Sequence, residues 1–343
     1  MAIIGMSASQ AGGTGPAATA QRRSPAGQAV GRLWRAVRGN RKAAIGAILL
    51  VIFAFMAVFP WLITHDPPEA EIYAKSLGPS AHHLFGTTSF GQDIFAQFVW
   101  GARETMIIAV VSGLISTALS VIIGLAAAYL GGIPDAVLSY VTDVLLVLPT
   151  FPLLIIIAAF TPNGGVGILI AVLVVTGYSY GARQLRSQAL SMRHRDFLEA
   201  ARVRGERSLY IVFVEIIPTM TSLIVATFLG TAVYNVIFAA GLQFIGFGNP
   251  SSVSWGTMLY WAENEEALQT GQYLWAIVPG VCIALLGAAF ALLNYAFDEI
   301  GNPALRRVPG VRRRRLLPGG RPPQTPPGQR RSFLPVTRRL RRA

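Results

Sequence analysis

The side chains that could carry out covalent or metal-dependent chemistry are few and scattered along the chain. The four histidines are His65, His82, His83 and His194. The adjacent His82 and His83 would point in different directions on a strand or a helix, which disfavours a shared metal ion. Cys282 is the single cysteine, and the loop Gly-x-x-x-x-Gly-Lys-Ser/Thr that binds nucleotide phosphates does not occur. These patterns predict a protein that is not an enzyme and holds no metal or cofactor of its own.

Three acidic side chains lie within or at the ends of strongly apolar segments: Asp135, Asp143 and Glu215. A carboxylate inside a membrane is costly and is therefore a functional candidate. We assign Asp143 as a candidate residue of a transport pathway; pairing with a partner subunit or with a water in that pathway is the alternative. An ion-coupled carrier normally needs more acids or broken-helix ion sites near the middle of the membrane, so this scarcity counts against that class.

The composition predicts an all-α polytopic membrane protein. Of the 343 residues, 53% are hydrophobic and 13% are charged, and the mean hydropathy is +0.51. Soluble proteins carry roughly 25% charged residues. Apolar segments long enough to cross a bilayer predict six transmembrane helices near residues 43–63, 105–130, 134–160, 166–182, 209–231 and 274–297. Proline and glycine within these segments, including Pro149 and Pro152, predict kinks and close helix packing.

The positive charges are concentrated in three segments. All lysines and arginines except Lys75 and Arg103 lie in residues 1–42, 183–207 and 301–343. Basic residues accumulate on the cytoplasmic side of membrane proteins. Both tails and the middle loop are therefore predicted to be cytoplasmic, so the chain crosses the membrane an even number of times. The charge then faces anionic membrane lipids, and no nucleic-acid partner is expected.

This topology divides the chain into five parts. They are a cytoplasmic tail at 1–42, the first transmembrane helix at 43–63, an extracytoplasmic segment at 64–103, the main membrane domain at 104–298, and a basic disordered cytoplasmic tail at 299–343. Within the first tail, residues 31–42 fit equally well a basic amphipathic helix on the membrane surface or a plain topogenic charge cluster.

Residues 209–248 are almost continuously apolar and could hold nearly two spans. The even number of crossings allows only one, which we place at 209–231. Residues 232–248 are then predicted to be a bent or re-entrant piece at the outer face, broken by Gly241, Gly246 and Gly248. Irregular backbone at that depth must be covered by protein or face a water-filled cavity.

The loop between the fourth and fifth predicted spans is the most specific feature of the chain. The Asp196 carboxylate can accept hydrogen bonds from free backbone N–H groups, which predicts a helix that starts at about Phe197. Phe197, Ala200, Ala201 and Arg204 would share one face of that helix. The two alanines on this face would let a second protein surface approach closely. An ordinary amphipathic loop helix is the alternative.

The same loop resembles the EAA signature of ABC importer permeases, Glu-Ala-Ala followed by a glycine and, about a dozen residues later, by Leu-Pro. Gly205 permits a backbone conformation that other residues resist, and Pro218 would kink the start of the next span. The matching residues are Glu199, Ala200, Ala201, Gly205 and Pro218. Ile217 stands in place of the usual leucine, and Glu215 occupies a position that is often isoleucine.

Further segments resemble the second, C-type permease of dipeptide and oligopeptide importers. His83-Leu84-Phe85-Gly86-Thr87 and the following Gly91, Asp93 and Gly101 resemble its outer segment. Residues 242–248, with Gly246 and Gly248, and residues 254–259, with Trp255 and Gly256, resemble its Leu-Ser-Phe-Leu-Gly-Leu-Gly and Ser-Trp-Gly-x-Met-Leu motifs. The family commonly has Gly-Thr-Asp and Gly-Arg-Asp here, and this chain has Thr88 in place of the first aspartate and Gln92 in place of the arginine. The resemblance covers residues 35–307 and implies that the glycines, Thr87 and Trp255 belong to extracytoplasmic or gate motifs.

The resemblance implies a type I ABC importer permease fold in a bacterial plasma membrane. It implies a partner permease of the B type, two cytosolic ATPases that carry ATP and magnesium, and an extracytoplasmic solute-binding lipoprotein. Glu199, Ala200, Ala201, Arg204, Gly205 and Pro218 would couple the chain to an ATPase. The expected cargo is di- or oligopeptides; a nickel complex, a glutathione-like peptide or an oligosaccharide is the alternative. An ion-coupled carrier or a structural subunit is disfavoured by the EAA-like loop.

Overall fold

The computed structural model describes residues 40–160, 165–193, 195–207 and 210–301. The amphipathic segment expected at 31–42, apart from its last three residues, and almost all of the basic tail expected at 299–343 lie outside these residues. The described part belongs to one compact unit that extends to Pro303.

The described residues form helices joined by short connections and one long outer loop. The helices are α2 (Arg41–Val58), α3 (Pro60–Ile63), α4 (Ile94–Leu130), α5 (Gly132–Val147), α6 (Thr150–Ala159), α7 (Val166–Met192), α8 (Asp196–Val203), the π-helix η1 (Ile211–Ile216), α10 (Ile217–Thr219), α11 (Thr221–Phe244), α12 (Trp255–Asn264) and α13 (Tyr273–Gly301). Among the described residues, β-pairing is limited to one isolated bridge between Thr87 and Asp93. The all-α fold class is confirmed.

Within the described part of the chain, five helices are long and apolar enough to cross a membrane: α2, α4, α7, α11 and α13. A sixth crossing is formed by α5 and α6 if this pair is one span, with a bend of 92° between them. The predicted continuous span at 134–160 is therefore broken. Leu148 has an extended backbone (φ −62°, ψ 133°) directly before Pro149, because the proline ring disfavours helical geometry in the preceding residue.

The expectation of a bent or re-entrant piece at 232–248 is wrong. One helix, α11, runs from Thr221 to Phe244 and includes Gly241. A side chain at Gly241 would crowd the Phe151 ring, 3.1 Å from the Cβ position, so this glycine serves packing and not a bend. The helix ends at Phe244, and the chain turns at Gly246, whose φ of +85° favours glycine. The predicted start at 209 is replaced by the distorted η1–α10 segment.

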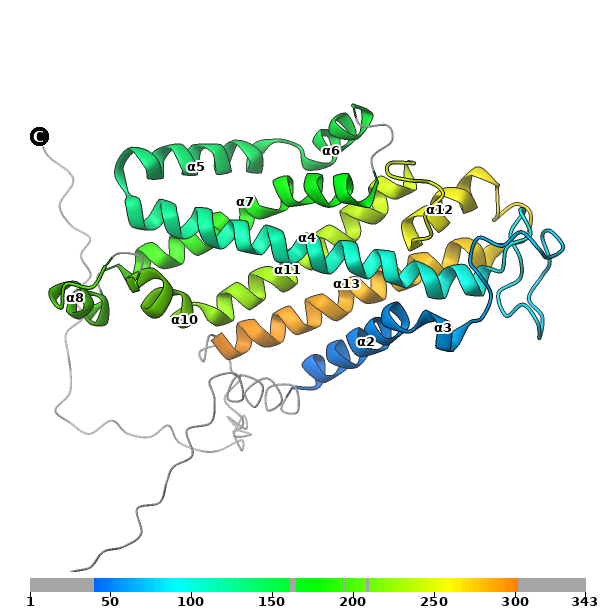
Figure 1. Cartoon of the computed structure of the whole chain (residues 1–343), viewed down its shortest axis with the longest axis horizontal. Helices are drawn as coiled ribbons and strands as arrows, with labels where there is room; N and C mark the ends of the chain where they lie inside the picture. Colours follow the sequence, from blue (N-terminus) through cyan, green and yellow to red (C-terminus); the bar gives the residue numbers. More distant parts are fainter. Residues whose placement is uncertain (1–39, 161–164, 194, 208–209, 302–343) are drawn as a thin grey trace, which may run out of the picture. The chain divides into compact units, whose positions relative to one another are not determined.

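The long helices pack through small residues. Figure 1 shows α4, α7, α11 and α13 running side by side. A Cβ atom on Gly124 of α4 would lie 2.6 Å from the carbonyl oxygen of Ala182 on α7, so the backbones approach closely there. The fully buried Asn235 of α11 donates to Ser112 Oγ of α4 at 2.7 Å. The spans are thus held by close approach and by interhelical hydrogen bonds.

Candidate functional site

The loop helix α8 starts one residue earlier than predicted. It spans Asp196–Val203, and the preceding Arg195 is its N-cap, with extended backbone and no side-chain capping bond. The predicted capping role of Asp196 is therefore wrong. Asp196 and Glu199 lie in the first helical turn instead, where their negative charges interact favourably with the helix dipole.

Gly205 ends α8 by adopting a backbone conformation that residues with a side chain resist, as the sequence predicted. Its φ of +74° lies in the left-handed region. The Gly205 N–H donates to the Arg202 carbonyl at 2.9 Å, and the Glu206 N–H donates to the Ala201 carbonyl at 3.2 Å. This pair of bonds is the Schellman motif, in which glycine is the favoured residue. The chain therefore turns back sharply after a helix of only two turns.

One face of α8 is buried and the other is exposed. Ala201 lies on the buried face, although it was predicted to share an exposed face with Ala200. Leu198 is 1% exposed and Ala201 is fully buried, whereas Val203 is 89% exposed. Glu199, Ala200 and Arg204 are exposed as well. Ala201 therefore does not share an outward face with Ala200, because it packs against this chain itself. Sequence reasoning missed Leu198; its spacing of three residues from Ala201 was the available signal.

The inward face of α8 rests on a hydrophobic cluster at the α8 end of the bundle. Leu198 and Ala201 join residues from three other helices: Leu125 and Ala128 of α4, Leu185, Ala189 and Met192 of α7, and Ile211 and Ile216 of η1. A displacement of α8 must therefore disturb the ends of α4 and α7, because packed interiors have few voids.

The return from α8 to the membrane is distorted. Pro218 has no N–H to donate to the Val214 carbonyl, and the six residues before Ile217 form the π-helix η1. The Arg204 guanidinium lies 3.7 Å from the carboxylate of Glu215 and 3.7 Å from that of Glu206. Glu215 at the usual isoleucine position thus faces the loop arginine.

Helix α7 ends at Met192, ten residues beyond the predicted end of its span. Its arginines Arg183 and Arg186 lie opposite the two acids of α5. Arg186 donates to Asp135 through two bonds, Nε to Oδ1 at 2.6 Å and Nη2 to Oδ2 at 2.7 Å. Arg183 lies 3.4 Å from Asp143, and both side chains of this second pair are more than half exposed. Asp143 thus pairs with an arginine of its own chain, which was not predicted from the sequence. Its role in a transport pathway and its pairing with a partner subunit or a pathway water stay predictions.

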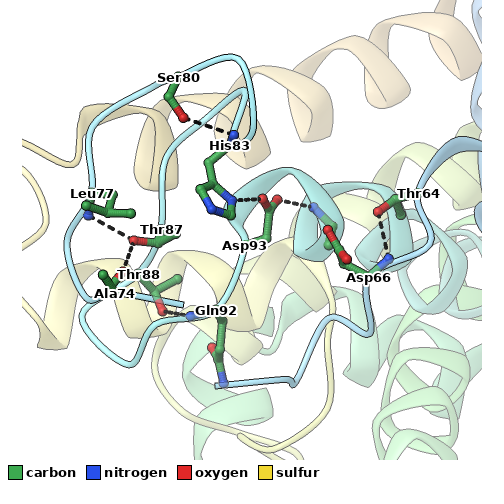
Figure 2. Close-up of polar contacts among 11 residues, drawn as sticks. Thr64, Asp66, Ala74, Leu77, Ser80, His83, Thr87, Thr88, Gln92 and Asp93 are labelled. Atoms are coloured by element: carbon green, nitrogen blue, oxygen red, sulfur yellow. Dashed lines mark hydrogen bonds and ion pairs between the residues drawn. The ribbon is translucent and has the colours of Figure 1, made fainter. Parts of the chain in front are cut away.

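A compact loop at 64–93 precedes α4, and its polar contacts are drawn in Figure 2. His83 Nδ1 lies 2.7 Å from Asp93 Oδ2, while Asp93 Oδ1 caps α4 by accepting from the Ala96 N–H at 2.9 Å. The predicted separation of His82 and His83 holds here, since His83 is buried and His82 is exposed. A hydrogen bond to Asp66 raises the pKa of Tyr73, whose ring lies against His83.

The expected gate motif Gly86-Thr87 is a structural centre of this loop. Thr87 Oγ1 donates to the Ala74 carbonyl at 2.7 Å and accepts from the Leu77 N–H at 2.8 Å. Gly86 has φ +83° and lies against the Leu77 carbonyl oxygen so closely that no side chain fits. Thr87 itself is fully buried. The two residues therefore fix the loop, and their assignment to an extracytoplasmic or gate motif stays a prediction.

The second outer motif is anchored by Trp255. This fully buried residue donates from Nε1 to the Phe98 carbonyl at 2.9 Å, and its ring stacks on the Phe98 ring. Ser254 precedes it as the N-cap of α12 and forms a capping box with Thr257. These contacts join the start of α12 to the start of α4.

A polar network that the sequence did not reveal surrounds this motif. Ser254 Oγ donates to Gln243 Oε1 at 3.0 Å, and Gln243 Nε2 donates to Glu104 Oε1 at 3.2 Å. Ser252 Oγ also donates to Glu104 Oε1, at 2.9 Å. The partners are far apart in the sequence, so no local pattern identifies them. The network ties the end of α11 to α4 and to the segment before α12.

Gly246 and Gly248, two further predicted motif residues, both have positive φ, +85° and +107°. The Gly246 N–H donates to the Gln243 carbonyl at 2.9 Å, and the Phe247 N–H donates to the Leu242 carbonyl at 2.9 Å. Gly246 thus ends α11 by the same Schellman motif with which Gly205 ends α8. After Gly246 the chain leaves the helix and continues to Ser252 and Trp255.

The two ends of the bundle are linked by α4. Its first residue follows Asp93 of the outer loop, and its Leu125 belongs to the cluster under α8. A helix of 37 residues is roughly 55 Å long. Direct contact between the α8 cluster and the Trp255 motif is therefore excluded. Among the described residues, no group of three His, Cys, Asp or Glu side chains could hold a metal ion.

The chain matches two family models. Residues 120–306 match the model described as "Binding-protein-dependent transport system inner membrane component". Residues 30–79 match the model described as "N-terminal TM domain of oligopeptide transport permease C". The two matches lie in the order and at the positions that the motifs implied.

Individual relatives are similar over most of the chain. The dipeptide transport system permease protein DppC of Bacillus subtilis is 29% identical over 276 residues, which cover 80% of this chain and 85% of the relative. The oligopeptide transport system permease protein OppC of the same organism is 28% identical over 275 residues, covering 79% and 88%. OppC of Mycobacterium bovis is 32% identical over 228 residues, covering 66% and 78%. These matches confirm the resemblance inferred from the motifs.

Proposed function

The chain belongs to the family of binding-protein-dependent transport system inner membrane components, and from that premise we propose that it is one permease subunit of an ATP-driven importer of di- or oligopeptides. It is a multi-pass protein of the plasma membrane. The observation that carries the proposal is the two-faced helix α8: Leu198 is held in the bundle while Val203 projects outward. Such a helix can accept force on one face and pass it on through the other.

The proposed partners are those that membership of this family implies. A cytosolic ATPase would contact the outward face of α8, formed by Glu199, Ala200, Val203 and Arg204. A second, B-type permease would present its own loop helix to a second ATPase, and the two permeases would enclose the pathway. An extracytoplasmic binding protein would deliver cargo to the side that holds Trp255. ATP and magnesium would be bound by the ATPases.

The mechanism requires two conformations that differ by only a few kcal/mol, so that nucleotide and cargo can bias them. Closure of the ATPase pair would push α8, and Leu198 and Ala201 would carry the displacement into the ends of α4 and α7. Since α4 reaches from the α8 cluster to the outer loop, its movement would act on the Glu104–Gln243 contact. Opening of the outer side would follow from this coupled movement.

Peptide cargo is proposed because relatives of this chain are named dipeptide and oligopeptide permeases. A nickel complex, a glutathione-like peptide or an oligosaccharide is the alternative cargo for the same machine. Calorimetry of the cognate binding protein with a peptide panel, a nickel complex and an oligosaccharide distinguishes them. Peptide binding in the micromolar range or tighter supports the proposal, and binding of only another class replaces the cargo assignment.

The ATP-driven mechanism is tested by reconstitution. The chain, its B-type partner and the ATPases are placed in proteoliposomes with binding protein and labelled peptide, and uptake is measured with and without ATP hydrolysis. We expect uptake only with hydrolysis, and Glu199→Ala should lower uptake per ATP consumed. Uptake driven by an ion gradient without the ATPases would instead favour a carrier. Thiol labelling of cysteines introduced into the two tails tests whether both termini are cytoplasmic.

A further inference from the structure

A pocket of about 330 Å³ lies between α8 and the bundle, and the proposed coupling does not use it. We propose that this pocket binds an anionic phospholipid of the surrounding membrane leaflet. It is lined by Leu125, Ala128 and Tyr129 of α4, Ala189 of α7, Arg193 directly after α7, Leu198 and Arg202 of α8, and Val212 and Ile216 of η1. This site is independent of which cargo the protein transports.

The walls of the pocket are apolar. Leu125, Ala128, Ala189, Leu198 and Ile216 belong to the hydrophobic cluster under α8 and are at most 6% exposed. Apolar walls with a few polar groups at one side are the usual composition of a small-molecule site. An acyl chain gains from contact with these walls, whereas water or a free ion does not.

Two arginines form a cationic rim around the pocket, and their charges can bind an anionic ligand. Arg193 and Arg202 are exposed, and neither forms an ion pair with a carboxylate of the described residues. Arg193 interacts electrostatically with Asp135, but both carboxylate oxygens of Asp135 already accept hydrogen bonds from Arg186. Leu198 and Arg202 are four residues apart, so the wall and the rim lie on one side of α8.

A phospholipid fits this combination better than other occupants do. The terminal segments 1–39 and 302–343 contain arginines and no acidic residue, so their charge repels the rim. A protein that grips the exposed Val203 contacts the opposite face of α8. Inorganic phosphate complements the two arginines but leaves the apolar walls unfilled. α4 and α7 are each long and apolar enough to cross a membrane, and their ends line the pocket, so it lies on the side of the bundle that faces one membrane surface.

Occupancy has a consequence for α8. Because Leu198 lines both the pocket and the cluster that seats the helix, a bound lipid fills space that α8 would otherwise cross when it moves. The lipid would therefore hold α8 in the position described above. Anionic lipid content would then set how readily the loop helix moves.

The test measures lipid retention on the purified full chain by native mass spectrometry, with phosphatidylglycerol and phosphatidylcholine in separate arms. A basic residue near an anionic membrane surface contributes about 1 kcal/mol, so Arg193→Gln/Arg202→Gln should weaken phosphatidylglycerol binding roughly 10- to 30-fold. The matched control Arg195→Gln/Arg207→Gln removes the same charge from the same loop outside the pocket and should leave binding unchanged. Ala189→Phe, which keeps both rim charges, should abolish retention by filling the pocket.

Three results would overturn the proposal. Equal weakening by the rim and control variants would mean that total loop charge, and not the pocket, attracts lipid. Equal retention of phosphatidylcholine would remove the role of the arginines. Displacement of the lipid by excess inorganic phosphate would identify a phosphate site. If Ala189→Phe does not fold, as judged by thermal unfolding, the two arginine variants alone decide the question.

Discussion

Gly256 and Gln243 are packed so closely that the glycine hydrogen occupies the only space available. A Cβ atom at Gly256 would lie 2.5 Å from Oε1 of Gln243 and 2.6 Å from its Cβ. Gln243 is at the same time the residue that bonds Ser254 and Glu104. The glycine of the outer Ser-Trp-Gly motif is therefore required so that the polar network can form.

We predict that Gly256→Ala displaces Gln243 and lowers the free energy of unfolding by about 1–3 kcal/mol, the usual cost of overpacking. Thermal unfolding in nanodiscs measures this change. Gly280→Ala in α13 is the matched control, because no atom lies within 4 Å of a Cβ at that position. Helix propensity favours alanine over glycine at both positions, so an equal loss of stability in the two variants would show that the Gln243 contact is not the cause.

The outward face of α8 gives a second prediction. Val203→Glu leaves the fold intact because Val203 is 89% exposed. It should reduce ATP-driven uptake about tenfold or more, since an unpaired charge would be buried against the ATPase. Ser191→Glu adds the same charge at the end of α7 and should transport normally. Undiminished uptake by the Val203 variant would show that the ATPase does not contact this face.

Gly205 gives a third prediction, because its φ of +74° is strained for residues with a side chain. No atom of the described residues lies within 4 Å of its Cβ position, so the effect of a substitution is expected to arise from the backbone and not from a clash. Gly205→Ala should cost about 1 kcal/mol and loosen the end of α8, whereas Gly205→Asn should cost less. Hydrogen exchange at the Glu206 amide measures the loosening. Equal exchange in all three proteins would contradict the Schellman assignment.

These residues show where sequence reasoning succeeds and where it stops. Gly205 was predicted because left-handed geometry is a local property of one residue type, and kinks were predicted at Pro149 for the same reason. The 92° size of the bend was not predictable, since it depends on how α5 and α6 pack against α7. The inward position of Ala201 and the Glu104–Gln243 contact depend on tertiary packing, and the latter joins residues 139 positions apart. Composition predicted that the chain crosses the membrane several times, whereas the break at Pro149, the bounds of α11 and the pairing of polar groups came from the fold.

The ion pairs between α5 and α7 give the last prediction. Thr142 is the single buried residue of α5, so few apolar contacts hold this helix in the chain. The bidentate pair of Asp135 and Arg186 is partly buried, and a double-mutant cycle with Asp135→Asn and Arg186→Gln should give a coupling energy of about 1–3 kcal/mol.

Asp143 and Arg183 supply an internal control, because that pair is exposed and 3.4 Å apart. Its coupling energy should be about 0–1 kcal/mol, since solvent screens exposed pairs. The swapped variant Asp135→Arg/Arg186→Asp should recover part of the stability lost in either single charge reversal. Denaturant unfolding of each set in identical nanodiscs measures all of these values. A coupling energy for the exposed pair that equals or exceeds that of the bidentate pair would show that α5 is held by contacts other than Asp135.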